Sequence, residues 1–147
     1  KQFFSKLKDK IPDGEKKNLI YKIDCECERC YIGQTSRQLK QRISEHEGGC
    51  RKLNRIINAD IINETDFREI ISKTALLEHA AEFDHVFDFK NVKILDQTSN
   101  TSQLNVLEML HIINNKTVNR RTDTINLCHI YNGILHLRED WRRKRKN

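Results

Sequence analysis

The chain contains LIYKI at residues 19–23 and, after a short segment with three cysteines, YIG at residues 31–33. Isoleucine and tyrosine favour the extended backbone of a β-strand. Two such runs on either side of a short turn are typical of an antiparallel hairpin. We therefore expect these residues to form the first two strands of the fold.

A helix is expected directly after the hairpin. Thr35 or Ser36 can cap this helix, which continues to about Glu47. It carries two stripes of residues four positions apart, an apolar one with Leu39 and Ile43 and a polar one with Arg42 and His46. The apolar stripe can pack against the hairpin, so the polar stripe is available for chemistry.

Three further elements are expected later in the chain: a helix over residues 66–83, a strand over 91–95 and a helix from Ser99 or Asn100 to about Ile113. The patterns leave residues 48–63 and 125–137 unassigned. Within the first of these segments, Cys50 follows Gly48-Gly49 in an expected loop and is not expected to bind a ligand.

The composition is that of one folded domain with a charged surface. The chain has 147 residues, of which 37% are hydrophobic and 33% charged, and a formal net charge of +6. A chain of this length can bury about 70% of its unfolded surface, which is enough for one core. No apolar run approaches the ~20 residues that cross a bilayer, and the first residues contain no signal-peptide stretch, so we exclude membrane and secretory classes.

Three regions are expected: a basic amphipathic N-terminal arm at residues 1–17, a domain at 18–137 and a basic tail at 138–147. The arm is expected to begin as a short helix, because four apolar residues recur at helical spacing, Phe3, Phe4, Leu7 and Ile11. Since the first residue is Lys1 rather than Met, we expect the chain to be a piece of a longer polypeptide. The tail is either a polyanion-binding or nuclear-targeting segment or a solvated terminus.

Cys25, Cys27 and Cys30 lie within six residues, a spacing that suits a metal ion better than a disulfide framework. Zinc takes four thiolate or imidazole ligands in a tetrahedron. One such set is available from Cys25, Cys27, His79 and His85. The pair Cys27 and Cys30 has the more usual CxxC spacing and competes with it, and three unligated thiols are a third interpretation.

A second group of residues has the chemistry of phosphodiester hydrolysis. It consists of Tyr21 and Tyr31 on the two expected strands, Arg42 on the following helix and Glu108 on the last one. A phenol can accept or relay a proton, a guanidinium can bind a phosphate, and a carboxylate can hold a divalent cation. Each residue also has an ordinary structural interpretation, since strand tyrosines are usually core and charged helix residues usually face solvent.

These motifs, in this order and spacing, resemble those of the GIY-YIG nuclease family, and more closely the endonuclease domain of Penelope-like retrotransposons. The resemblance covers about residues 18–124 and is carried by five strings: IYKIDCEC at 20–27, YIGQT at 31–35, EH at 78–79, NVKIL at 91–95 and EMLHI at 108–112. Leu19 stands where the family's first motif has glycine, and one extra residue separates Tyr31 from Arg42 relative to the bacterial repair nucleases. Retroelement members commonly share both departures.

The resemblance implies an α/β (α+β) fold, in which a small antiparallel three-stranded sheet is flanked by helices and carries an inserted zinc site. It assigns six catalytic residues: Tyr21, Tyr31, Arg42, His46, Glu108 and Asn119. In this assignment Tyr21 or His46 accepts the proton of the attacking water, and Glu108 holds a catalytic Mg²⁺. His111, three residues further on, is either a neighbour of that ion or a packing or surface residue.

The resemblance also implies a structural Zn²⁺ on Cys25, Cys27, His79 and His85. The leading hypothesis is a metal-dependent endonuclease that nicks target DNA and provides a 3′-hydroxyl primer for target-primed reverse transcription of a retroelement. The expected partners are the DNA substrate, the element RNA and the reverse transcriptase portion of the same polyprotein, with no membrane, and the expected location is the nucleus. Two alternatives stay open: a zinc-stabilised nucleic-acid-binding module without catalysis, and a structure-specific DNA-repair nuclease of the same superfamily.

Overall fold

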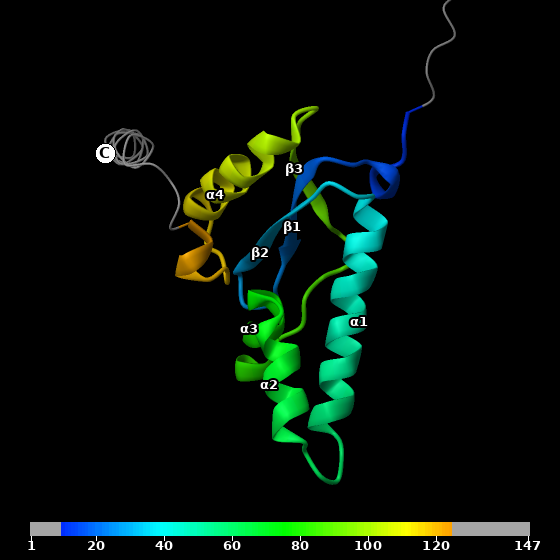
Figure 1. The fold of residues 1–147 in the computed structure, drawn as a ribbon, viewed down its shortest axis with the longest axis vertical. Coiled ribbons are helices and arrows are strands. Elements are labelled where there is room, and N and C mark those ends of the chain that lie inside the picture. Colours follow the sequence, from blue (N-terminus) through cyan, green and yellow to red (C-terminus); the bar gives the residue numbers. More distant parts are fainter. Residues whose placement is uncertain (1–9, 125–147) are drawn as a thin grey trace, which may run out of the picture.

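The structure is a computed structural model that describes residues 10–124 (Figure 1). Most of the expected N-terminal helix, the segment 125–137 and the basic tail at 138–147 therefore lie outside the described residues. No helix among the described residues is both long and apolar enough to cross a membrane. The elements follow in the order η1 (Asp13–Glu15), β1 (Leu19–Asp24), β2 (Cys30–Thr35), α1 (Leu39–Ile57), α2 (Glu64–Ser72), α3 (Ala75–Phe83), β3 (Lys93–Gln97), η2 (Thr101–Gln103), α4 (Leu104–Asn114) and η3 (Arg121–Thr124).

The strands form one antiparallel sheet in the order β2-β1-β3. The first two strands are the expected hairpin, in which Tyr21 pairs with Gly33. The third strand, two residues later in the chain than expected, pairs with the other side of β1. These observations confirm the α+β class and the small three-stranded antiparallel sheet.

Helices cover both faces of the sheet, because successive side chains of a strand point to opposite faces. Leu19, Tyr21 and Ile23 belong to the core cluster that includes residues of α1, α2 and α3. Ile20 belongs to a second cluster with residues of α4, which lies on the side of the sheet away from α1 (Figure 1). Since all four side chains are fully buried, β1 is the centre of the fold and its apolar run needs no polar face.

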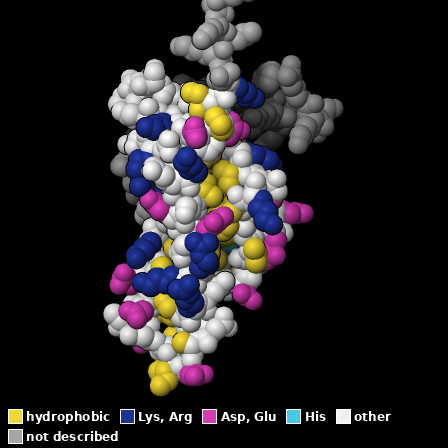
Figure 2. All heavy atoms as spheres, turned by 90° about the vertical axis from the view of Figure 1, so that its right-hand side faces the viewer, with side chains coloured by type: hydrophobic (Ala, Val, Ile, Leu, Met, Phe, Trp, Pro, Cys, Tyr) yellow, Lys and Arg dark blue, Asp and Glu magenta, His cyan; other side chains and the backbone are white. Residues whose placement is uncertain are grey.

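The first helix is longer than expected. It continues from Leu39 to Ile57 through both glycines, so the expected end at Glu47 and the expected loop at Cys50 are wrong. Leu77 of α3 packs against Gly49, where a Cβ would lie 3.1 Å from its side chain, and this close contact compensates for the low helix propensity of glycine. The long helix forms much of one face of the molecule, on which Lys and Arg side chains gather (Figure 2).

The helix caps also differ from expectation. Neither Thr35 nor Ser36 caps α1, because the hydroxyl of Thr35 instead accepts a hydrogen bond from the Arg37 backbone N–H at 3.1 Å. The expected helix over residues 66–83 is two helices, α2 and α3, and Thr74 caps the second by accepting from the backbone N–H of Leu77. Asn100 caps the 3₁₀ turn η2, after which α4 begins at Leu104.

Candidate functional site

Three of the expected catalytic residues form a hydrogen-bonded chain between β1 and α1. The Tyr21 hydroxyl lies 2.8 Å from Nε2 of His46, and Nε–H of Arg42 donates to the same hydroxyl oxygen at 3.2 Å. Arg42 and His46 are one helical turn apart, so both reach the sheet face on which Tyr21 lies. The polar stripe predicted from the sequence is therefore directed at Tyr21.

Tyr31 completes this aromatic group from the neighbouring strand. Its ring centroid lies 6.4 Å from that of Tyr21 and 5.2 Å from that of His46, against which it packs edge-on. Tyr31 and Tyr21 point to the same face of the sheet because Tyr21 pairs with Gly33, two residues from Tyr31. Tyr21 and His46 are buried almost completely, whereas the Arg42 side chain is 29% exposed. Arg42 is therefore the member of this group that offers the most surface to a ligand.

Gly33 has to be a glycine for this arrangement to form. A Cβ at this position would lie 2.5 Å from the Tyr21 hydroxyl oxygen and 2.6 Å from its Cζ atom. We expect Gly33→Ala to displace the Tyr21 ring and to lower the free energy of unfolding by about 1–3 kcal/mol, although alanine is otherwise the better strand residue. Urea unfolding measures this change.

The matched control is Gly48→Ala. A Cβ at Gly48 would meet only the guanidinium end of Arg51, at 3.8 Å, in the interior of α1. This variant should be more stable than the wild type by about 0.5–1 kcal/mol, because alanine is the better helix former. If Gly33→Ala were as stable as the wild type, the close packing of Tyr21 on Gly33 would be contradicted.

The protonation states of the buried groups follow from their surroundings. Burial lowers the pKa of His46 to about 4, and the charge of Arg42 acts in the same direction. The imidazole is thus neutral at pH 7, and its Nε2 atom can accept a proton. Burial raises the pKa of Tyr21, so its phenol is protonated and donates toward His46 while its oxygen accepts from Arg42. The hydrogen bond between the Tyr21 hydroxyl and His46 therefore provides a route for a proton from Tyr21 to His46.

Glu108 lies on α4 and is held from the sheet. Nε2 of Gln34, on β2, donates to the Glu108 carboxylate at 2.8 Å. Burial raises the pKa of Glu108 to about 7, and the negative charge of Asp123 adds to this effect. Burial also raises the pKa of Tyr31, on which the charges of Arg42 and Glu108 act in opposite directions. The positive charge of Arg42 therefore acts to lower the pKa of both Glu108 and Tyr31, against the larger effect of burial.

A polar hollow of about 380 Å³ lies beside these groups, between β2 and the start of α4. We call it the β2–α4 hollow; Gln34, Arg37, Arg42 and Thr101 contribute to its walls. A larger groove of about 760 Å³, between α1 and residues 86–90, is lined by none of the six expected catalytic residues. The larger groove and the expected catalytic residues therefore lie at different places on the surface.

Asn119 is held against the backbone of the edge strand β2. Its side-chain oxygen accepts from the Ile32 N–H at 3.0 Å, and its side-chain nitrogen donates to the Ile32 carbonyl at 2.8 Å. The backbone around Thr117 pairs with Cys30 on the same edge. Asn119 thus continues the pairing of the sheet and positions η3, where Asp123 approaches Glu108.

Two residues of this region had no role in the sequence-based hypothesis, Gln34 as the donor to Glu108 and Asp123 as a second carboxylate. Gln34 lies inside the quoted string YIGQT, and strand alternation would have placed it on the α4 side. His111 of α4 lies 3.6 Å from Asp96, and no hydrogen bond joins it to Glu108 among the described contacts. This supports the surface interpretation of His111.

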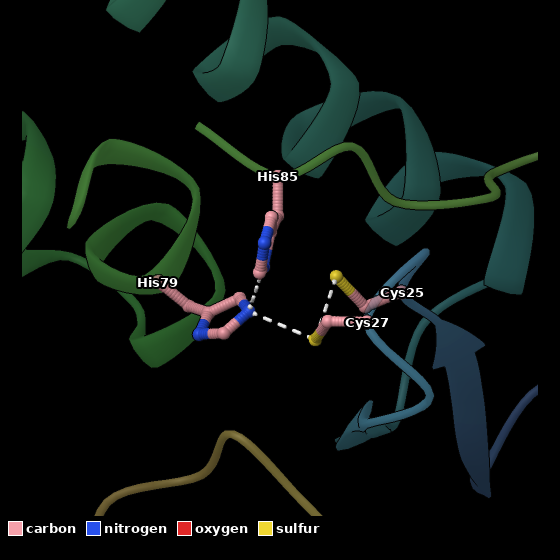
Figure 3. A group of neighbouring side chains, drawn as sticks. All are labelled: Cys25, Cys27, His79 and His85. Atoms are coloured by element: carbon pink, nitrogen blue, oxygen red, sulfur yellow. Dashed lines mark hydrogen bonds between the residues drawn. The ribbon is translucent and has the colours of Figure 1, made fainter. Parts of the chain in front are cut away.

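The second site is a compact group of four potential metal ligands, Cys25, Cys27, His79 and His85, whose ligand atoms all lie within 4.8 Å of one another (Figure 3). The distances are 3.5 Å between the two sulfurs, 3.4 Å from Cys27 Sγ to His79 Nε2 and 3.0 Å from His79 Nε2 to His85 Nδ1. A tetrahedral zinc ion with bonds of about 2.0–2.3 Å separates its ligands by about 3.3–3.8 Å. The group could therefore hold a metal ion such as zinc with little adjustment.

The backbone explains why these ligands meet. Asp84 ends α3 in the left-handed conformation, with φ 55°, and so turns the chain at His85 back toward the sheet. The backbone N–H of Glu26 then donates to the Val86 carbonyl at 3.2 Å. An isolated antiparallel bridge between Cys25 and Phe87 continues this pairing beyond the end of β1.

Cys30 is not part of the group. Its buried thiol lies 3.5 Å from the Lys116 carbonyl, to which it can donate, and it belongs to the core cluster on the α4 side. Cys25, by contrast, belongs to the cluster on the α1 side together with Tyr21 and Ile23. The competing Cys27 and Cys30 pair is therefore not the set that the fold gathers.

Comparisons of the chain with protein-family models, with curated proteins and with solved structures give no match. What the chain can do must then be inferred from its two residue groups. One is a potential four-ligand metal centre of two thiols and two imidazoles. The other is a buried tyrosine and histidine pair with a partly exposed arginine and a nearby carboxylate.

Proposed function

We propose that this chain is a metal-dependent DNA endonuclease of the GIY-YIG type that hydrolyses a phosphodiester bond. The observation that carries the proposal is the Tyr21 hydroxyl, held between His46 and Arg42 at 2.8 and 3.2 Å. A guanidinium beside a phenol and an imidazole combines a phosphate-binding cation with groups that can move a proton. The polar β2–α4 hollow next to Arg42 is large enough to admit a phosphate group.

In this proposal Arg42 binds the scissile phosphate and stabilises its additional negative charge in the transition state. The neutral His46 receives a proton through Tyr21, whose phenolate form is favoured by the hydrogen bond and charge of Arg42. Tyr31 orients the phosphate from the neighbouring strand. Asn119 acts as a positioning residue, because both ends of its amide are bonded to β2.

Glu108 fits the role of a ligand for Mg²⁺. This ion commonly binds proteins through one or two carboxylates and completes its coordination with water and substrate phosphates. Glu108 offers one carboxylate beside the β2–α4 hollow, and the nearby Asp123 and Gln34 supply further oxygen atoms. When bound, the ion would neutralise charge on the phosphate and polarise the attacking water.

We further propose that Cys25, Cys27, His79 and His85 hold a structural zinc ion. Four protein ligands leave no position open for water or substrate, which distinguishes a structural zinc ion from a catalytic one. The site joins the turn after β1 to the end of α3 and the segment that follows. It would stabilise the end of α3 and the segment after it against the sheet that carries the tyrosines.

The biological role proposed from the sequence resemblance is that of a retroelement endonuclease. Such an enzyme nicks target DNA in the nucleus and provides the 3′-hydroxyl for reverse transcription. Its partners would be the target DNA, the element RNA and the reverse transcriptase of the same polyprotein. The cysteine and histidine group favours this role over a repair nuclease, because the resemblance to the retroelement enzymes includes these four positions.

The direct test is to incubate the chain with supercoiled plasmid DNA, with and without Mg²⁺. The proposal predicts Mg²⁺-dependent conversion to the relaxed circle, with ends that a polymerase can extend. Absence of any cleaved product under all divalent cations would contradict it. A structure-specific repair nuclease would instead cut branched or flapped oligonucleotides in preference to the plasmid.

Arg42→Ala should lower the single-turnover cleavage rate by about 10²–10³-fold, because one charge-assisted contact to the reacting group is lost. Arg42→Lys should recover part of the rate, since lysine keeps the charge but not the planar pair of donors. The matched control is Arg68→Ala, which removes an exposed arginine of α2 that pairs with Glu64 and lines neither hollow beside Arg42, and it should keep the wild-type rate. If Arg42→Ala weakened only DNA affinity and left the rate unchanged, its catalytic role would be wrong.

A nucleic-acid-binding module without catalysis is the second candidate. The observation in its favour is that Tyr21 and His46 are almost fully buried, as a purely structural core pair would be. This candidate predicts DNA binding without cleavage and no effect of Mg²⁺. The plasmid assay therefore separates the two functions directly.

A further inference from the structure

We propose that a second hollow, between α1 and α2–α3, binds the sugar-phosphate backbone of the nucleic acid several nucleotides away from the scissile phosphate. This α1–α2 hollow has a volume of about 330 Å³ and is lined in part by Arg42, Lys52 and Lys73 and by the backbone at Gly48. The inference deepens the proposed function and rests on it only for the position of the scissile phosphate.

Arg42 connects this hollow with the site. It lines both the β2–α4 hollow, next to Gln34, and the α1–α2 hollow. A nucleic acid strand that places one phosphate at Arg42 in the first hollow can therefore continue toward the second, which the same side chain borders. Lys and Arg side chains also gather over α1 in the surface view (Figure 2).

The periodicity of α1 sets the spacing of the contacts. Arg42, Gly49 and Lys52 line the same hollow at positions i, i+7 and i+10. At a rise of 1.5 Å per residue, Arg42 and Lys52 are about 15 Å apart along the helix axis. Phosphates of one duplex strand advance by about 3.4 Å per step along the duplex axis and also turn around it, so Lys52 would meet a phosphate a few steps from the one at Arg42.

Gly48 gives independent support. A Cβ there would meet nothing closer than the end of Arg51 at 3.8 Å, so internal packing does not require glycine. Glycine nevertheless destabilises a helix interior. Gly49 is different, because Leu77 packs directly against it. A glycine that internal packing does not require is expected where a ligand approaches the helix backbone closely.

The charges of the hollow suit a polyanion. Glu45 contributes one carboxylate, but Arg37 and Arg42 already hold it at 2.7 and 2.9 Å. Lys73 lies 3.2 Å from Glu69 in an exposed pair, which contributes little and exchanges readily with another anion. Lys52 is exposed. The lining residues of the hollow thus include three cations, Arg42, Lys52 and Lys73, and one carboxylate, Glu45, a formal excess of two positive charges.

The test measures the affinity of the full chain for a fluorescent DNA duplex as a function of salt, without added divalent cation. In Lys52→Ala/Lys73→Ala, the slope of log K against log salt should fall in magnitude by about 2, and affinity at 0.1 M salt by about eightfold or more per lysine. Gly48→Leu should weaken binding without any change of charge. Urea unfolding of Gly48→Leu shows whether weaker binding comes from a folding defect.

The control is Lys40→Ala/Lys90→Ala, which removes two charges from another hollow beside α1 and should keep the wild-type slope. Equal slopes for both double variants would overturn the inference, whether or not the protein cuts DNA. A loss confined to Lys52→Ala/Lys73→Ala in a protein that never cuts DNA would support this binding surface and contradict the nuclease. Once a cut is mapped, ethylating one of the phosphates a few steps away should weaken binding of the wild type but not of Lys52→Ala/Lys73→Ala.

Discussion

Glu108→Gln is expected to reduce DNA cleavage by about 10³-fold or more and to leave the fold intact. Glutamine has the same shape and can still accept the hydrogen bond from Gln34, but it lacks the charge that holds a divalent cation. Loss of a metal that neutralises the phosphate corresponds to several kcal/mol of transition-state stabilisation. Single-turnover cleavage over a range of Mg²⁺ concentrations measures the effect.

The matched control for this substitution is His111→Ala, one turn further along α4. His111 lies against Asp96 rather than in the Glu108 group, so cleavage should stay within a few-fold of the wild type. Cleavage by Glu108→Gln at a comparable rate would remove Glu108 from the catalytic group. Asp123, whose charge raises the pKa of Glu108, would then be the next carboxylate to replace.

The same variant should also change how stability depends on pH. Burial raises the pKa of Glu108 to about 7, above its value of about 4.3 in an unfolded chain. The folded state therefore binds this proton more tightly, and the fold loses stability as pH rises from about 4 to above 7. Without added Mg²⁺, Glu108→Gln should exceed the wild type in unfolding free energy by about 1–3 kcal/mol at pH 8 but not below pH 4. An equal difference at both pH values would contradict the buried ionisation.

Removal of the metal from Cys25, Cys27, His79 and His85 should lower the free energy of unfolding by several kcal/mol. Binding free energy at a site that exists only in the folded state is folding free energy. The loss is large because an ordinary domain is stable by only about 5–15 kcal/mol. Thermal unfolding with and without a chelator measures it, and elemental analysis should find about one zinc ion per chain.

Two pairs of variants make this test specific. His79→Ala should abolish the chelator response, whereas His111→Ala should keep it. Cys25→Ala should lose the metal, whereas Cys30→Ala should retain it, because its thiol lies on the other side of the sheet. An active protein without zinc, or one whose melting temperature ignores chelators, would contradict the structural metal. Loss of zinc in Cys30→Ala alone would assign the ligands to Cys27 and Cys30.

Local patterns predicted the hairpin but not the helix ends, and the class of the fold was implied by the resemblance to a known family. The run at residues 19–23 is apolar enough to indicate a strand by itself. Gly48 and Gly49 look like a turn because glycine weakens helices, yet packing of Leu77 keeps α1 continuous through them. Tertiary contacts of this kind have no local signal.

The candidate sites could likewise be predicted only in part, because some of their residues depend on tertiary contacts. Cysteine spacing offered Cys25, Cys27, His79 and His85 as one possible ligand set, which the structure brings together, and left Cys27 and Cys30 as a competing pair. Strand alternation could have decided between Cys25 and Cys30. Cys25 follows the odd-numbered positions of β1, which face α1, whereas Cys30 shares the other face with Ile32. The position of Asp123 could not be predicted, because it depends on a long-range pairing with the edge of β2.

The central place of β1 has a consequence for synthesis of the chain. Of the three strands of the sheet, β1 leaves the ribosome first, but its contact through Asp24 and Lys93 joins residues 69 positions apart. The edge of β2 is covered only when residues 116–119 arrive. Until then the nascent hairpin exposes apolar side chains on both faces and unpaired strand edges, which favour misassociation. Cys25 and Cys27 likewise have to await both histidines, so the four potential metal ligands can meet only after residue 85 has been made.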